Sequence, residues 1–223
     1  METSLDYSFR DPGLLETALT HSSYKRENIG VKEDNERLEF IGDAVLDSII
    51  GMELYSTLIN KPEGTLTKLR SLIVCERSLA RLGRSIRLNE ELKLGTGERH
   101  TGGENKDSII ADAVEAVIGA MFVDSGYDAA RDRVIRLFDP IIQDALSGKL
   151  FEDYKSEFQE EIQKIINVPS ITYVTDREEG PDHMKTFHVH VEVNGKKMGS
   201  GSGRSKKEAG QNAAKEALNK LKR

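Results

Sequence analysis

From Pro12 to about Leu146, apolar residues recur at three- and four-residue spacing, which is typical of amphipathic helices. Turn-prone pieces rich in Gly, Asn and Asp interrupt this pattern. The helical segments are residues 13–24, 38–59, 66–86, 107–123 and 128–146, and the turns between them include 60–64, 95–105 and 124–128. No alternating strand pattern is present in this part of the sequence. We therefore predict an all-α domain of several packed helices.

The pattern changes after a short hinge that begins near Ser147. A helical segment is followed by three segments that alternate or favour β-branched and aromatic residues, with Gly-bearing turns between them. An Ala-rich helix with Ser205 as its N-cap closes the chain. The order α-β-β-β-α predicts a small α+β domain, in which one antiparallel sheet carries both helices on one face. The chain is thus predicted to be multidomain, with domains at 1–147 and 154–223 and a linker at 148–153.

Charge is distributed unevenly along the chain, which the net charge of −6 conceals. Residues 1–150 carry 19 Lys and Arg against 26 Asp and Glu, whereas residues 196–223 carry nine against two. Such a concentration of basic residues is typical of a surface that binds phosphates. A nucleic-acid partner is therefore compatible with the acidic composition.

Other features of the composition favour a reducing compartment. No window approaches the ~18 apolar residues of a transmembrane helix, and the N-terminus lacks an apolar signal segment. Cys75 is the single cysteine and lies within the helical segment at 66–86, so we expect a buried structural thiol. These observations predict a cytoplasmic protein with no membrane contact.

Acidic residues occur at helical spacing within two of the predicted helices. Glu36, Glu39 and Asp43 are separated by three and four residues, so they share one face of the first helix. Asp112 and Glu115 form a second pair in an otherwise apolar helix, where carboxylates are costly unless a cation compensates them. Brought face to face, the two sets would form an oxygen-ligand cage for a hard divalent ion such as Mg²⁺.

Other interpretations of these polar residues remain open. Acids are often solvated or paired with Arg, and we assign that role to Asp47; periodicity does not show that the two helices meet. His21 and His100 could act as a general base, but neither has a nucleophile or an orienting partner nearby in sequence. We expect His21 to pack at a helix end, and Lys106 either to position phosphate or to be solvated.

The segment NERLEFIGDAVL closely resembles the signature of the ribonuclease III endonucleases, usually NERLEFLGDAVL, with the single change at Ile41. ALTHSSY before it, the pair Glu63-Gly64 and GGENKDSIIADAVEAVIGA after it match as well, in the family's order. The resemblance implies a metal-binding quartet of Glu39, Asp43, Asp112 and Glu115, in which Asp43 and Glu115 are catalytic. It implies supporting roles in the cleft for Glu36 and Glu63. No position of the quartet is altered.

The same resemblance implies the reaction and the assembly. The expected enzyme hydrolyses double-stranded RNA with Mg²⁺, for which Mn²⁺ can substitute, and leaves 5′-phosphate and 3′-hydroxyl ends with short 3′ overhangs. Its expected substrates are ribosomal RNA precursors and structured messenger RNA. A homodimer is implied, with Phe40 plugging into the partner subunit; an ordinary core position for Phe40 is the alternative.

Residues 153–223 resemble the double-stranded-RNA-binding domain, through DYKSEFQEEIQ, GPDH and GSGRSKKEAGQNAAKEAL. A-form RNA presents 2′-hydroxyls in a shallow minor groove and rows of phosphates beside it. The resemblance assigns minor-groove contacts to one helix and one loop, and phosphate contacts to the last helix. The residues are Gln159, Glu160 and Gln163 on the helix, His183 in the loop, and Lys206 and Lys207. Gly210 departs from the family, which usually has Glu there.

Two rival functions remain possible at this level. A non-cleaving double-stranded-RNA-binding protein would carry the same second domain. Carboxylates near the phosphates would only weaken its RNA binding, so the intact acids argue against this function. A helical metal-dependent phosphohydrolase acting on nucleotides would not need a duplex-RNA module.

Overall fold

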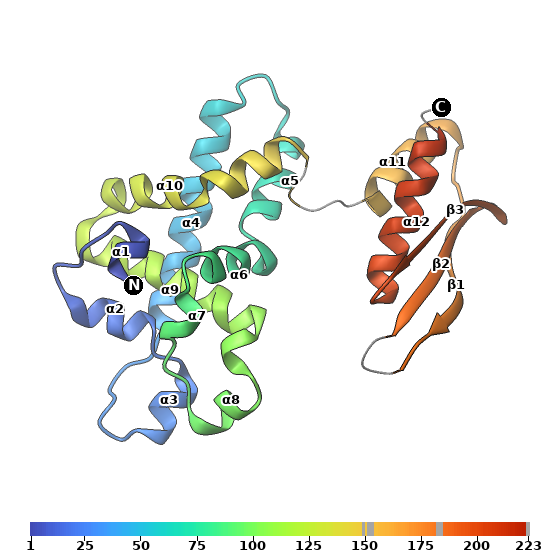
Figure 1. Cartoon of the computed structure of the whole chain (residues 1–223). Coiled ribbons are helices and arrows are strands. Elements are labelled where there is room, and N and C mark those ends of the chain that lie inside the picture. The colour runs from blue at the N-terminus through green and yellow to red at the C-terminus, as the bar shows by residue number, and fades with distance from the viewer. Residues whose placement is uncertain (149, 151–153, 182–184, 222–223) are drawn as a thin grey trace. The chain divides into compact units, whose positions relative to one another are not determined.

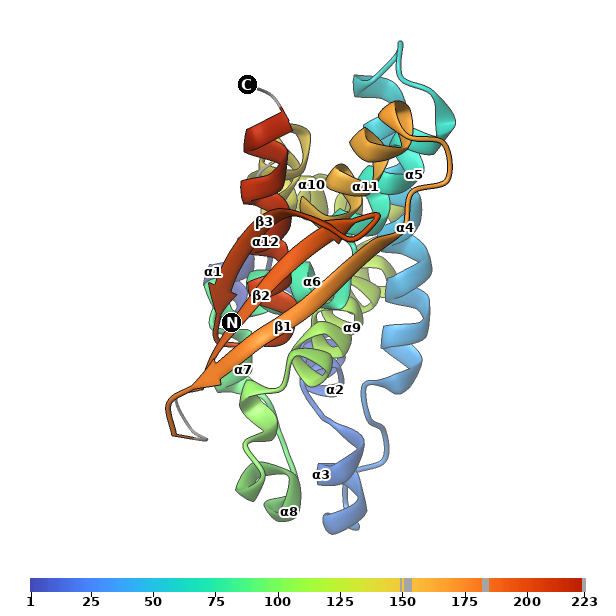
Figure 2. The ribbon, with the colours of Figure 1, turned by 90° about the vertical axis from the view of Figure 1, so that its right-hand side faces the viewer.

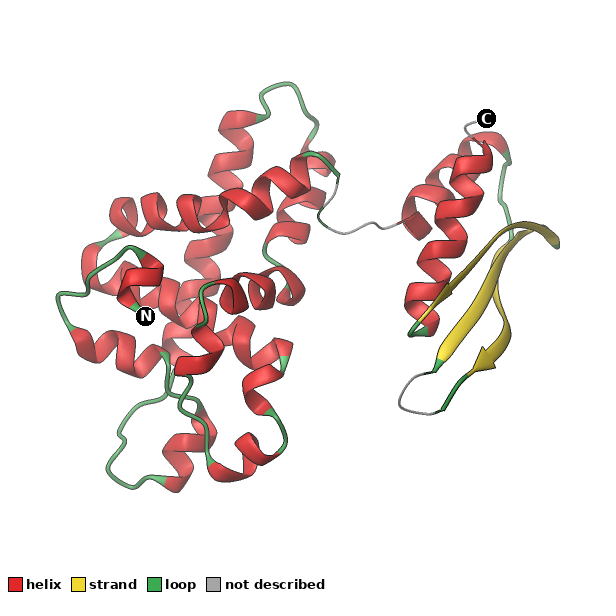
Figure 3. Ribbon diagram, viewed as in Figure 1, coloured by secondary structure: helices red, strands yellow, loops and turns green. Residues whose placement is uncertain are grey.

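A computed structural model describes residues 1–148, 150, 154–181 and 185–221 (Figure 1). The chain divides into two compact units, Met1–Leu150 and Phe151–Arg223, which we describe separately. In the described residues the strands all lie in the second unit (Figure 3). An all-α domain followed by a small α+β domain, the predicted fold class, is therefore confirmed. No described helix is long and apolar enough to cross a membrane.

The first unit is built from ten α-helices and one 3₁₀ turn among its described residues. They are α1 (Glu2–Leu5), α2 (Pro12–Ala18), α3 (Ser22–Glu27), α4 (Glu36–Thr57), α5 (Glu63–Ile73), α6 (Glu76–Ser85), α7 (Leu88–Glu91), α8 (Thr96–His100), η1 (Gly103–Asn105), α9 (Asp107–Ser125) and α10 (Tyr127–Leu146). The apolar run of α9 is buried along most of its length, and α4, α6, α10 and α2 pack around it. Helix α9 is thus the centre of this unit's core.

Four sequence-based predictions differ from the structure. The segment 66–86 is two helices, because the backbone at Cys75 is extended and the Ser78 hydroxyl donates to the Leu72 carbonyl. Cys75 is therefore a partly exposed helix cap, and its predicted full burial is wrong. The segment 13–24 is also broken, where residue 20 forms a β-bridge with Lys93. The predicted turn at 95–105 contains α8 and η1.

The second unit is a three-stranded antiparallel sheet with helices on one side. Its elements are α11 (Tyr154–Ile165), β1 (Ile171–Glu179), β2 (Thr186–Val193), β3 (Lys196–Gly203) and α12 (Lys206–Leu221). The strands follow the order β1-β2-β3, and α12 packs against β2 and β3 and beside α11 (Figure 2). The Ser205 hydroxyl accepts a hydrogen bond from the Glu208 N–H, which confirms the predicted N-cap.

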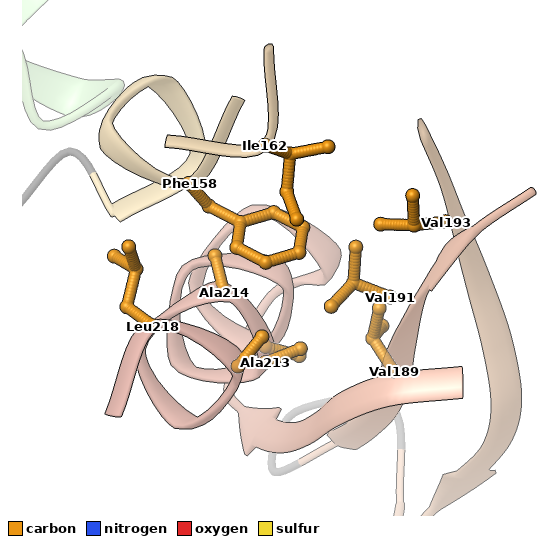
Figure 4. Packing of buried hydrophobic residues seen from close by; sticks show 10 residues of the cluster. Phe158, Ile162, Val189, Val191, Val193, Ala213, Ala214 and Leu218 are labelled. Atoms are coloured by element: carbon orange, nitrogen blue, oxygen red, sulfur yellow. The ribbon is translucent and has the colours of Figure 1, made fainter. Parts of the chain in front are cut away.

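Alternate residues of β2 form the floor of this unit's core (Figure 4). Val189, Val191 and Val193 are buried, because the period of a strand places them on the same face. Phe158 and Ile162 of α11 cover them, one helical turn apart. The core of this unit therefore follows from the two-residue period of a strand in β2 and the helical period in α11.

Small residues allow α12 to lie directly on β3. A Cβ added at Gly199 or Gly201 would stand 2.4 Å from the Ala213 carbonyl oxygen or 2.3 Å from the Ala213 nitrogen. The opposing positions of α12 are buried alanines at 209, 213, 214 and 217. Larger side chains on either surface would separate the helix from the sheet, so the alternation of Gly and Ser in β3 is a packing requirement.

We predict that Gly201→Ala lowers the melting temperature of the chain's second unit, because overpacking of this kind costs about 1–3 kcal/mol. Ser202→Ala is the matched control, since Ser202 is exposed one position away on the opposite face. Circular dichroism melting checks both variants. Equal melting temperatures for Gly201→Ala and the unmodified chain would contradict the proposed contact.

Candidate active site and RNA-binding surface

Two glycines bring the backbones of α4 and α9 into direct contact. A Cβ added at Gly42 would lie 1.8 Å from the Glu115 carbonyl oxygen, and one added at Gly119 would lie 2.1 Å from the Leu38 carbonyl oxygen. Each glycine thus provides the space that the other helix occupies. The close crossing places the acidic turns of both helices opposite each other.

Carboxylates from the two helices converge at this crossing. Ligand oxygens of Glu39, Asp112 and Glu115 lie within 4.8 Å of one another, a group that could hold a metal ion. Asp43 is exposed and is not part of that group, but its charge is the largest charge effect on Glu115. The structure therefore brings together three of the four predicted residues and places the fourth at their edge.

The acids at the crossing hold their protons unusually strongly. Burial is the main cause, and together with the charges of Asp43, Asp112 and Glu39 it raises the pKa of Glu115 to about 8. Burial is also the main cause of the raised pKa values of Asp112 and Glu39. The pKa of Glu39 is raised in addition by the charge of Asp112.

The donor set fits a hard divalent cation. Its members are carboxylate oxygens, which such ions prefer, and they are partly withdrawn from water. The raised pKa values show that the surrounding protein compensates these charges poorly. A bound cation would remove that repulsion.

The other predicted acids lie outside the group of ligand oxygens. Glu36 is exposed in the first turn of α4, where its charge contributes to the raised pKa of Glu39. Glu63 begins α5, is exposed, and accepts a hydrogen bond of 2.7 Å from the Thr67 hydroxyl. Asp47 lies 3.8 Å from Arg70, in agreement with its assignment to an Arg-paired role.

His21 lies at a helix end, as predicted, and is tied there by Ser23. Its Nδ1 accepts from the Ser23 N–H at 3.2 Å and lies 2.8 Å from the Ser23 hydroxyl oxygen. Burial raises the pKa of Asp112, and the charge of His21 acts against that shift. Sequence reasoning missed this neighbour, because the two residues are far apart in the chain. Lys106 is paired with Glu98 at 2.6 Å.

Phe40 projects from α4 with 78% of its surface exposed. The alternative of an ordinary core phenylalanine is therefore wrong. Met52 and Tyr55 are also exposed, at 57% and 69%, and their spacing of three residues places these two side chains on one face of α4. We name the exposed apolar residues Phe40, Met52 and Tyr55 the α4 stripe.

The predicted RNA-contacting residues on the second unit are exposed wherever the structure describes them. Gln159, Glu160 and Gln163 lie on the outer surface of α11, and Lys206 and Lys207 begin α12. His183 lies outside the described residues. Glu178 of β1 was missed by sequence reasoning: its carboxylate pairs with Lys206 at 2.8 Å and with Lys185 at 3.3 Å.

The departure from the family pattern at Gly210 has a structural counterpart. A Cβ added at this buried glycine would lie 2.5 Å from Nζ of Lys155. Nζ of Lys155 lies over the ring of Tyr173, 4.1 Å from the ring centroid. The glycine therefore provides space for a side chain from α11 to cross α12.

Comparisons with known proteins match both units. The model of a ribonuclease-III-like family matches residues 11–141, and that of the double-stranded RNA binding motif matches residues 154–221. The Ribonuclease 3 of Caldanaerobacter subterraneus subsp. tengcongensis is 46% identical over 221 residues, which cover 99% of this chain and 96% of that protein. The Ribonuclease 3 of Pelotomaculum thermopropionicum is 47% identical, with 99% and 91% covered.

A solved structure supports the assignment of the helical fold. The nuclease domain of ribonuclease III from Campylobacter jejuni matches with a TM-score of 0.59 and 41% identity, and the match covers 62% of this chain and 94% of that domain. A helical nuclease unit with converging carboxylates, followed by a duplex-RNA-binding unit, defines the class of protein. The chain belongs to the ribonuclease III family, and it is an endoribonuclease of double-stranded RNA.

We predict that Glu115→Gln stabilises the metal-free chain, and that the gain increases with pH. In the folded state the pKa of Glu115 is raised to about 8 from an ordinary value of 4.5. The stability linked to this proton is therefore complete below about pH 4.5 and is lost as the pH rises through about 8. Glutamine cannot ionise, so it avoids that loss.

Thermal melts in chelator from pH 5 to pH 9 provide the measurement. Above pH 8, the melting temperature of the variant should exceed that of the unmodified chain by a few degrees, since each kcal/mol corresponds to roughly 2–4 °C. Glu90→Gln is the control, since Glu90 is exposed outside the carboxylate group. A difference that stays constant with pH would show that Glu115 is not the group responsible.

Proposed function

We propose that this chain cuts duplex RNA with a divalent ion held between α4 and α9. Glu39, Asp112 and Glu115 would hold the ion, with Asp43 at its edge. The convergence of the Glu39, Asp112 and Glu115 carboxylates, whose pKa values are raised, is the observation that supports the proposal. Oxygen-only ligands favour Mg²⁺, and Mn²⁺ is able to substitute.

The bound ion would supply a water activated for attack on phosphorus and a positive charge beside the leaving 3′ oxygen. The protein's own contribution is to orient the ligands. The Gly42 and Gly119 contacts set the spacing of the two helices, and partial burial of Glu115 keeps its carboxylate directed at the shared site. Direct attack of water would leave a 5′-phosphate and a 3′-hydroxyl.

Cutting both strands requires two active sites, and we propose a homodimer formed through the α4 stripe. Exposed aromatic residues on a long helix are typical of an interface. The nuclease domain of the Campylobacter jejuni relative has a region involved in dimer formation. Two offset sites would leave short 3′ overhangs. Glu36 and Glu63 would support the cleft from its margin.

The second unit would bind the duplex through its shape. Gln159, Glu160, Gln163 and His183 are assigned to minor-groove contacts, and Lys206 and Lys207 to phosphates. Three features support the assignment: the match to the RNA-binding motif, the exposure of the described residues, and the helix dipole behind the two lysines. Unlike the groove contacts, these lysines would not by themselves distinguish RNA from DNA.

Family membership supports the wider role. We propose ribosomal RNA precursors and structured messenger RNA as substrates, in the cytoplasm, with a nuclease domain at 1–147, a linker at 148–153 and an RNA-binding domain at 154–223. The division of the structure at Leu150 and the start of α11 at Tyr154 support these boundaries, and residues 149 and 151–153 of the linker lie outside the described residues. The non-cleaving alternative lacks support, because it does not explain why three partly buried acids converge on one site.

We predict that Asp43→Asn lowers cleavage of long duplex RNA at least ~100-fold while duplex binding stays within about twofold. The carboxylate acts on the ion, whereas affinity comes mainly from phosphate and groove contacts elsewhere. Gel analysis with Mg²⁺ or chelator, alongside filter binding, separates the two properties. Asp47→Asn, one turn along the same helix, is the control and should keep its activity. Loss of binding together with cleavage would show that Asp43 has been assigned the wrong role.

We predict that Phe40→Ala combined with Tyr55→Ala weakens the dimer at least tenfold, since buried interface aromatics commonly contribute about 2 kcal/mol or more. Sedimentation across a concentration series measures the dissociation constant. Val123→Ala is the control, as Val123 is 56% exposed but belongs to α9 and is not part of the α4 stripe. An unchanged dissociation constant in the double variant would rule out the α4 stripe as the interface.

A further inference from the structure

One carboxylate near the end of β1, that of Glu178, pairs with lysines from two other segments of the second unit. Glu178 binds Lys206 through Oε1 at 2.8 Å and Lys185 through Oε2 at 3.3 Å. Lys206 is the first residue of α12, whereas Lys185 directly precedes β2. The two lysines come from separate segments, and both pair with the carboxylate of Glu178.

The ring of Phe187 limits the position of Lys206 from another direction. Its centroid lies 5.7 Å from Nζ of Lys206, and Phe187 is the direct cross-strand partner of Glu178. The lysine is thus bounded by a carboxylate and an aromatic ring that the sheet register places side by side. A flexible side chain therefore acquires a defined location.

Stability does not explain this arrangement. The side chains of Lys206 and Lys185 are 62% and 36% exposed, and ion pairs at such exposure contribute little to the free energy of unfolding. Simple attraction for phosphate does not explain it either, because an acid beside two lysines repels the RNA backbone. What the bridge does provide is a fixed placement of two cations before RNA arrives.

We propose that Glu178 is a positioning residue that presets Lys185 and Lys206 for the phosphates of an A-form duplex and thereby favours RNA over DNA. The inference rests on the proposed phosphate role of Lys206. Without the bridge, two neighbouring ammonium groups repel each other and spread. Ordering the two side chains again on RNA then costs conformational entropy, which weakens binding. The phosphates of DNA have a different spacing, so the preset lysines make no matched contact with them. Removing the negative charge of Glu178 therefore leaves the affinity for DNA equal or makes it higher.

The test is filter binding of the full-length chain to matched RNA and DNA duplexes, in chelator and across a salt series. We expect Glu178→Gln to weaken RNA binding about three- to tenfold while DNA binding stays equal or becomes tighter. Glu179→Gln is the matched control: it removes the same charge at the next residue, whose partners are Arg177 at 2.8 Å and His188 at 3.3 Å. That control should leave the RNA-to-DNA affinity ratio unchanged.

Lys185→Ala breaks the same bridge from the other side and should also lower the ratio. A ratio unchanged by Glu178→Gln, or altered equally by Glu179→Gln, would overturn the positioning role. Lys206→Ala separates this outcome from a failure of the proposed function. If Lys206→Ala weakens both duplexes while Glu178→Gln leaves the ratio intact, only the positioning role fails. If Lys206→Ala changes neither affinity, its phosphate role fails, and the inference fails with it.

Discussion

The direct backbone contact between α4 and α9 is the constraint on which the active site depends. At Gly42 and Gly119 a single added carbon would overlap a carbonyl of the opposite helix. Because side chains on facing turns must then point into the same small volume, Glu39, Asp112 and Glu115 converge. A crossing at ordinary helix separation, about 8–10 Å between axes, would keep these carboxylates further apart.

The crossing brings acidic side chains together and partly buries them, which disfavours their charged forms and raises their pKa values. Burial and, to a smaller extent, the neighbouring negative charges together raise the pKa of Glu115 to about 8. The fold therefore tolerates acids that oppose its own stability in the absence of a cation. Buried groups of this kind are typical of functional sites, where the binding of a ligand offsets the cost. The stability of the apolar core of α9 makes that arrangement possible.

In the second unit, too, glycines allow two elements to approach closely, here a helix and a sheet. Glycines of β3 allow α12 to rest on the sheet, as the positions of Gly199 and Gly201 show. This contact determines where α12 begins and hence where Lys206 stands relative to Glu178. In both units, small residues bring backbones together, and charged side chains at the margin of the contact are placed as a consequence.

The sequence by itself determined the fold class, the α-β-β-β-α order and the acidic residues, because periodicity and motif are local properties of the chain. It did not show that the segment at 66–86 breaks at Cys75 or that Phe40 is exposed, since both depend on the surroundings of those residues. The convergence of the carboxylates was likewise decided only by the tertiary structure. Residues that meet across a helix crossing leave no periodic signal, and the same holds for the single carboxylate that Lys185 and Lys206 share.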